Sequence, residues 1–94
     1  MIKRLVKMTF DPEKTPDFEA IFQQSSPLIR QFPGCRHVEL LRELPGGNVY
    51  FTLSIWESEM HLEAYRQSEL FRSTWAKTKQ LFIDKPQAWS LTVC

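Results

Sequence analysis

The 94-residue sequence has little cysteine, little glycine and no excess of either charge. Its two cysteines, Cys35 and Cys94, stand far apart without the CxxC spacing of redox or zinc sites, which favours reduced thiols in a cytosolic protein. The three glycines form no phosphate-binding loop, and no flavin or nicotinamide fingerprint occurs. We therefore expect a cytoplasmic protein with no bound cofactor.

The charged residues also argue against several classes of partner. The net charge is +1, from 12 basic and 11 acidic residues spread along the chain, so neither a nucleic-acid surface nor a polybasic membrane patch is expected. No stretch approaches the roughly 20 apolar residues of a transmembrane helix, and charges interrupt the first ten residues, where a signal peptide would need its apolar run. Two histidines on different elements, without a nearby pair of carboxylates, do not predict a metal site.

The sequence is rich in large apolar side chains. Hydrophobic residues make up 43% of the chain and aromatic residues 13%, including seven phenylalanines and three tryptophans. A chain of this size buries a little over about 60% of its unfolded surface, so a single-layer core would be marginal. No repeat, linker or low-complexity segment divides the sequence, which predicts one domain over residues 1–94.

Alternation, helical spacing and capping residues predict six main elements. Residues 1–10 form a strand with Arg4, Val6, Met8 and Phe10 on one face. A helix then begins at an N-cap Thr15 and extends to residue 32, and Pro27 is expected to kink or split it after Gln24. Strands at 35–43 and 49–56 form a hairpin around the Pro-Gly-Gly-Asn turn of residues 45–48.

The second half of the chain completes the pattern. Ser58 caps a short helix that ends at residue 65, Ser68 caps another that ends near residue 82, and residues 88–94 form the last strand. The order strand, helix, strand, strand, helix, strand predicts an α+β ferredoxin-like fold: a four-stranded antiparallel sheet with helices on one face. The other face would expose Val49, Phe51, Leu53 and Ile55, so we expect a homodimer packed sheet to sheet.

The strand that ends in Trp56-Glu57-Ser58, followed by His61-Leu62-Glu63-Ala64-Tyr65 and then Ser68 and Phe71, resembles the antibiotic biosynthesis monooxygenase (ABM) domain family. The Pro33-Gly34-Cys35 turn and the order of elements match as well, so the resemblance spans nearly the whole chain. It implies a dimeric α+β barrel with a pocket between sheet and helices. It also implies quinol monooxygenase-like activity, although family members differ widely in substrate.

Three positions depart from the family's better-known active sites. Haem-degrading members carry an asparagine, a tryptophan and a histidine where this chain has Val6, Tyr65 and Trp75. Haem cleavage by that route is therefore not expected. Quinol-type members often carry histidine where Tyr65 stands, so tyrosine would replace their base with a hydroxyl group.

Oxygenation without a cofactor needs a base, one or two hydrogen-bond donors and a dry, aromatic-walled cavity. We expect Val6, Trp56, Phe71 and Trp75 to line the substrate pocket, although Phe71 and Trp75 at helical spacing also fit an ordinary core. Tyr65 could donate its hydroxyl to a substrate, or pack its ring and direct the hydroxyl to water.

Three further side chains are candidates for the chemistry. Arg4 would hold an anionic substrate if its strand face looks toward the helices, and the reading preferred from sequence is that it points outward or pairs with Glu39. Either His37 or His61 could act as a general base, because imidazole titrates near neutrality. A cross-strand polar pair would equally explain His37, and a solvated surface position would explain His61.

The sequence therefore predicts a homodimeric, cofactor-independent monooxygenase that oxidises a small aromatic molecule of the quinol type. Its catalytic candidates are His37, His61 and Tyr65, and its pocket candidates are Arg4, Val6, Trp56, Phe71 and Trp75. The alternative is a binding module that holds a small hydrophobic molecule, or haem, without turning it over. A third possibility is a dimer whose pocket is filled by the aromatic side chains and whose role is only structural.

Overall fold

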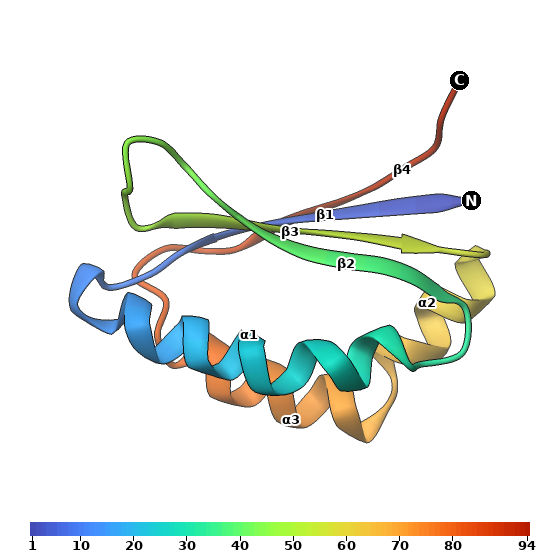
Figure 1. Cartoon of the computed structure of the whole chain (residues 1–94), viewed down its shortest axis with the longest axis horizontal. Coiled ribbons are helices and arrows are strands. Elements are labelled where there is room, and N and C mark those ends of the chain that lie inside the picture. The colour runs from blue at the N-terminus through green and yellow to red at the C-terminus, as the bar shows by residue number, and fades with distance from the viewer.

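The computed structural model describes all residues 1–94 (Figure 1). Its elements follow the predicted order, with one additional short 3-10 helix after the first strand. They are β1 (Ile2–Thr9), η1 (Pro12–Lys14), α1 (Thr15–Arg30), β2 (Cys35–Arg42), β3 (Val49–Trp56), α2 (Glu59–Arg66), α3 (Glu69–Lys79) and β4 (Gln87–Leu91).

The four strands form one sheet in the order β2-β3-β1-β4, and each neighbouring pair is antiparallel. Figure 1 shows the helices together on one side of this sheet, with the other side uncovered. The predicted ferredoxin-like α+β fold is therefore confirmed. The hairpin of β2 and β3 is also confirmed, with an irregularity in its register between Cys35 and His37.

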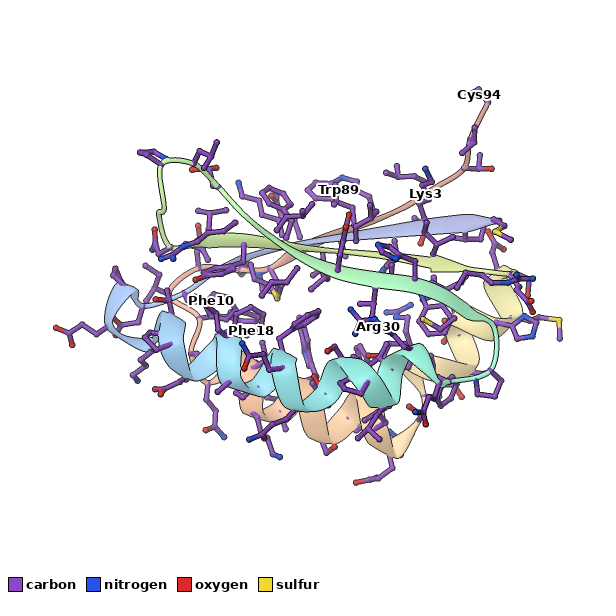
Figure 2. The ribbon with its side chains drawn as sticks, in the orientation of Figure 1. Lys3, Phe10, Phe18, Arg30, Trp89 and Cys94 are labelled. Carbon is purple, nitrogen blue, oxygen red and sulfur yellow. The ribbon has the colours of Figure 1, made fainter.

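The alternation along β3 separates an inner from an outer sheet face. Tyr50 and Trp56 are 1% and 0% exposed on the inner face, against the helices. Phe51, Leu53 and Ile55 lie on the outer face, opposite Lys7, Leu5 and Lys3 of β1. Figure 2 shows Lys3 and Trp89 on this outer side, whereas Phe10, Phe18 and Arg30 lie between the sheet and the helices. The outer face is thus largely apolar along its centre and has no cover within the chain.

Pro27 lies inside α1 without dividing it, so the prediction of a split after Gln24 is wrong. Proline removes one N–H and therefore leaves the carbonyl of Gln23 without its intrahelical donor. Both Gln23 and Pro27 are exposed, and water can pair with this carbonyl. The neighbouring Ser25, Ser26 and Ile29 are buried, and their packing against the sheet side supports one continuous helix.

The start of α1 also differs from the prediction. Thr15 is the first helical residue and not the N-cap, because the turn begins earlier at Asp11. The Asp11 carboxylate accepts a hydrogen bond from the Glu13 N–H at 3.0 Å and so caps η1, which continues directly into α1. By contrast, Ser58 and Ser68 cap α2 and α3 as predicted, accepting from the N–H groups of His61 and Phe71.

Gly34 lets the α1–β2 turn pass against α2. Its φ is +87°, and a Cβ added there would lie 2.3 Å from Cγ of His61. Gly34→Ala should lower the free energy of unfolding by about 2 to 4 kcal/mol, through left-handed strain plus a steric clash. Gly46→Ala is the matched control, because its φ is +96° but nothing lies within 4 Å of the added Cβ. Equal losses in urea denaturation of the two variants would contradict the contact with His61.

Candidate active site between the sheet and the helices

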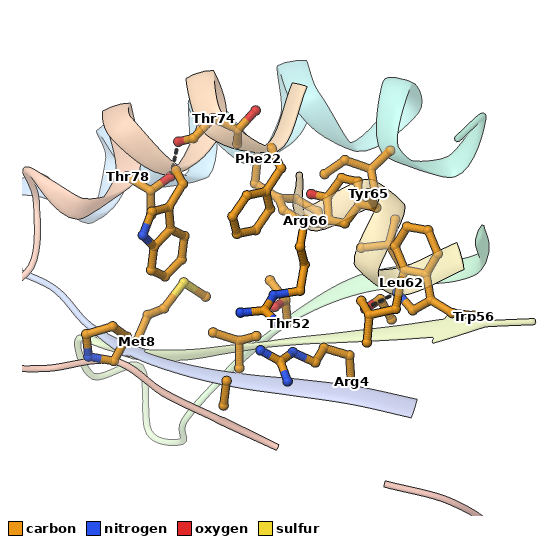
Figure 3. A pocket seen from close by; sticks show the side chains of 18 of the residues that line it. Arg4, Met8, Phe22, Thr52, Trp56, Leu62, Tyr65, Arg66, Thr74 and Thr78 are labelled. Atoms are coloured by element: carbon orange, nitrogen blue, oxygen red, sulfur yellow. Dashed lines mark hydrogen bonds between the residues drawn. The ribbon is translucent and has the colours of Figure 1, made fainter. Parts of the chain in front are cut away.

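A cavity of about 360 Å³ lies between the inner sheet face and the helices (Figure 3). Most of its wall is apolar: Val6 and Met8 of β1, Phe22 of α1, Leu62 of α2 and the aromatic residues of α3 all contribute. Small-molecule sites in proteins commonly begin at about 300 Å³ and combine such walls with a few polar groups. The aromatic side chains therefore leave room for a ligand, and the pocket is not collapsed.

Two aromatic rings of α3 form one wall. Phe71 and Trp75 are stacked with ring centroids 5.9 Å apart and planes within 9° of each other. Both line the cavity, and Trp75 also packs against the core cluster around Phe10. Thr74 and Thr78 continue the same helical stripe into the cavity. Their participation follows from the i, i+3 and i+4 spacing of residues along α3.

Trp56 and Tyr65 form the opposite end of the pocket. Their rings are stacked with centroids 4.8 Å apart, and Trp56 is 0% exposed. The indole N–H of Trp56 donates to the Ser54 hydroxyl at 2.9 Å, which satisfies its one polar group. Trp56 therefore borders the cavity but supports Tyr65 from behind more than it offers surface to a ligand.

The Tyr65 hydroxyl is the most perturbed acid of the pocket. Burial, with a smaller contribution from Cys35, raises its pKa to about 12. Its ring is enclosed by Phe32, Trp56 and Phe71, at centroid distances of 4.8 to 5.4 Å. At neutral pH the group is consequently protonated, and it can donate a hydrogen bond but cannot act as a base.

The raised pKa of Tyr65 makes the fold sensitive to alkali. The folded state holds this proton more tightly than the unfolded chain, where tyrosine titrates near 10, so stability is retained below about pH 10 and falls as the pH rises toward 12. Full titration would remove about 2 to 3 kcal/mol. Tyr65→Phe should lose less stability than the wild type between pH 9 and 12 in urea denaturation. Equal slopes in both proteins would contradict the burial of this hydroxyl.

Arg4 lies on the inner face of β1 and lines the cavity, so the preferred prediction that it points outward or pairs with Glu39 is wrong. The reason is register: its even-numbered position shares the inner face with Val6 and Met8. Its Nη1 donates to the Ser90 hydroxyl at 2.9 Å. Burial first, and then the positive charge of Arg66, lower the pKa of Arg4, whereas Glu63 opposes this change.

Arg66 is the main pocket residue that sequence reasoning missed. It is the last residue of α2, and Figure 3 shows it extending from the helical layer toward Arg4 on the sheet. Its Nη1 also lies 3.3 Å from the Glu63 carboxylate, at an exposed position. Its role depends on the orientation of α2 relative to the sheet, which no local pattern encodes.

Neither histidine lines the cavity. His37 is on the outer sheet face, where its Nε2 lies 3.3 Å from the carboxylate of Glu39, a residue of the same strand and not of a neighbouring one. The His61 ring covers Gly34, its Nδ1 lies 2.8 Å from the Ser58 hydroxyl, and its Nε2 lies 3.7 Å from Glu57. These contacts give His61 a structural place at the start of α2 and do not support either histidine as the base of this pocket.

The remaining sequence expectations concern metals and membranes. No group of three or more His, Cys, Asp or Glu side chains converges in a way that could hold a metal ion. None of the helices combines the length and the apolar character that crossing a membrane would require.

Comparison with known proteins identifies the family. The sequence profile described as antibiotic biosynthesis monooxygenase (ABM) matches residues 1–77, which include the first three strands, α1, α2, most of α3 and most of the pocket wall. The chain belongs to the antibiotic biosynthesis monooxygenase family. The profile match ends before β4, the edge strand at Gln87–Leu91. For that strand, the similarity to ABM proteins is one of structure and not of sequence profile.

Solved ABM structures share this fold over almost the entire chain. A crystal structure of an antibiotic biosynthesis monooxygenase superposes with a TM-score of 0.92 at 14% identity, covering 100% of this chain and 99% of the other. A protein of Caulobacter crescentus proposed to be such an enzyme gives a TM-score of 0.92 at 21% identity, covering 99% of this chain and 89% of the other. One of Bordetella bronchiseptica gives a TM-score of 0.87 at 26% identity, covering 99% of this chain and 96% of the other. No curated protein matches the sequence.

Proposed function

We propose that this ABM protein is a cofactor-independent monooxygenase that oxidises a small, electron-rich aromatic molecule of the quinol type. The observation that carries the proposal is the combination of an aromatic-walled cavity with two guanidinium groups, those of Arg4 and Arg66, as its only charged lining groups. Such a site favours a flat apolar ring that bears a developing negative charge.

The reaction balances without an external reductant. One atom of dioxygen converts a ring C–H into C–OH. The hydroquinone becomes a quinone and thereby supplies the two electrons and two protons that turn the second oxygen atom into water. Deprotonation of the phenol starts the sequence, because the phenolate is the stronger electron donor to dioxygen.

The arginine pair favours the anionic form of a bound substrate. A phenol ordinarily titrates near 10, and a neighbouring positive charge lowers the pKa of an acid by about 1 to 3 units. Arg4 and Arg66, partly offset by Glu63, would favour the anionic form of a bound substrate, and the phenol proton would leave to water, since no dedicated base lines the cavity. The protonated Tyr65 hydroxyl would then donate to a substrate oxygen.

The alternative function is binding without turnover. It is favoured by one observation: no histidine, aspartate or glutamate is among the residues that line the cavity. A pocket without a conventional proton acceptor would suit a module that stores or carries a small hydrophobic molecule. This alternative and the monooxygenase make the same prediction for binding but opposite predictions for oxygen consumption.

We also propose that the protein is a homodimer whose two sheets pack through their outer faces. The proposal is supported by the apolar residues along the centre of that face, Leu5, Leu53 and Ile55, and by Trp89 and Leu91 of β4, which are 41% and 46% exposed in the single chain. A second copy of the same surface would cover them symmetrically. The cavity lies on the opposite side of the sheet, so each subunit would hold its own pocket.

Oxygen uptake with a panel of substituted hydroquinones tests the enzymatic proposal. Wild-type protein should consume oxygen, and Tyr65→Phe should reduce the rate about 10-fold to 1,000-fold through loss of one donor. Trp75→Ala should also reduce it by removing part of the wall. Tyr50→Phe is the matched control: its hydroxyl binds Glu19 at the far core cluster and does not line the cavity. If the wild-type protein binds hydroquinones but consumes no oxygen, the alternative function, binding without turnover, is favoured.

A further inference from the structure

The cavity carries an unbalanced positive charge. Arg4 and Arg66 are its only ionisable cations, and no carboxylate is among its lining residues. The two guanidinium groups are close enough for Arg66 to disfavour the charged form of Arg4. Like charges gathered in a partly buried apolar site are costly unless an anion pairs with them.

The local partners compensate only part of this charge. Arg4 donates to a neutral hydroxyl of Ser90 and forms no ion pair with a carboxylate within 4.0 Å. Arg66 has Glu63 at 3.3 Å, but both side chains are about half exposed, at 44% and 55%. One carboxylate against two guanidinium groups leaves a single positive charge, which one monoanion would neutralise.

We infer that the substrate is an aromatic monocarboxylate, whose carboxylate is bound by Arg4 and Arg66 and whose ring lies against Phe71 and Trp75. This inference rests on the proposed function, since it names the substrate class of the same site. The planar fork of guanidinium matches a carboxylate in two parallel hydrogen bonds. A phosphate dianion would exceed the one charge left free.

The dimensions of the cavity limit the ring system. An engineered apolar cavity of about 150 Å³ holds one benzene molecule, so about 360 Å³ accommodates one or two fused rings with small substituents. Figure 3 shows Met8, Phe22 and Thr78 on one side of the two guanidinium groups, and Leu62, Tyr65 and Trp56 on the other. A ring held by its carboxylate at Arg4 therefore meets apolar side chains next to the anion site.

Calorimetric titration with gentisate, a carboxylated hydroquinone, and methyl gentisate, its neutral ester, tests the inference. The acid should bind the wild-type protein about 10-fold to 100-fold more tightly than the ester. Arg4→Gln and Arg66→Gln should each remove most of this preference, and Arg4→Lys should restore only part of it because lysine lacks the fork. Arg72→Gln is the matched control, on an exposed position of α3 outside the cavity. Circular dichroism verifies that each variant is folded.

Three binding results would overturn the inference: equal affinities for acid and ester, no measurable binding of the acid, or displacement of the acid by equimolar inorganic phosphate. Oxygen uptake by the same samples separates this inference from the proposed function. Tight binding of gentisate without uptake would defeat the monooxygenase proposal and leave the carboxylate site intact. Oxygen uptake at similar rates with hydroquinones that carry a carboxyl group and with those that lack it would defeat the carboxylate site and leave the monooxygenase proposal intact.

Discussion

Replacing Leu53 with lysine should convert the proposed homodimer into a folded monomer. Leu53 lies at the centre of the outer sheet face, between Leu5 of β1 and Glu39 of β2. A lysine there would place a charged group in the core of the interface, where its one carboxylate neighbour, Glu39, already lies 3.3 Å from His37, at a cost of about 3 kcal/mol. The dimer dissociation constant should therefore rise by a factor of about 100 or more.

Light scattering after size-exclusion chromatography measures this change at micromolar concentration. Leu28→Lys is the control, since Leu28 is 54% exposed on α1 and lies on the opposite side of the molecule from the outer sheet face. Its dimer should be unaffected. A monomeric wild-type protein, or a Leu53→Lys variant that stays dimeric at the same concentration, would contradict sheet-to-sheet packing.

Replacing Phe10 with alanine should cost the chain a large part of its stability. Phe10 is 0% exposed, and its ring contacts those of Phe18, Tyr50 and Phe82 at centroid distances of 4.1, 5.7 and 5.3 Å. Phenylalanine-to-alanine changes in a core cost about 3 to 5 kcal/mol, whereas complete domains are stable by about 5 to 15 kcal/mol. The variant should unfold at far lower urea concentration than the wild type.

Phe71→Ala provides the comparison, because Phe71 is only half-buried and one side of it faces the cavity. Its loss removes fewer contacts, and we expect about 1 to 2 kcal/mol, the range for a partly buried side chain. Equal destabilisation of the two variants would mean that the cavity is as tightly filled as the Phe10 cluster, and the proposed binding site would fail with it.

The sequence was most informative where local rules act alone. The bounds of β3 at Val49 and Trp56 follow from strict alternation beside a Gly-containing turn, and the Ser58 and Ser68 caps follow from a hydroxyl three residues before a free N–H. The predictions at Thr15 and Pro27 failed because other groups competed. Asp11 caps a turn that begins before Thr15. At Pro27 the helix continues because the Gln23 carbonyl, which lacks its intrahelical donor, is exposed and can accept a hydrogen bond from water.

The candidate site was predictable only in part. The aromatic wall of Phe71 and Trp75 was visible as helical spacing, and Arg4 was visible as a charge within an apolar strand face. The sequence could not decide which face of β1 meets the helices, and therefore assigned Arg4 to the wrong side. Arg66 could not be found at all, because its approach to Arg4 depends on how α2 crosses the end of the sheet.

The two histidines show the opposite difficulty. Imidazole chemistry made both histidines candidate bases. However, His37 lies on the outer face of β2, and the His61 ring packs against the turn at Gly34. With both outside the cavity, the account depends on cations that stabilise a substrate anion in place of a residue that accepts a proton. The ABM family assignment is compatible with this arrangement and does not by itself decide it.

The most direct measurement of the central claim is turnover of gentisate under isotopically labelled dioxygen, with the product analysed by mass spectrometry. The account predicts a hydroxylated quinone that carries one labelled oxygen atom, with the other label recovered in water. It also predicts that Arg4→Gln loses this product while Arg72→Gln retains it. Unlabelled product, or no product from a folded protein that binds gentisate, would contradict a monooxygenase site between the sheet and the helices.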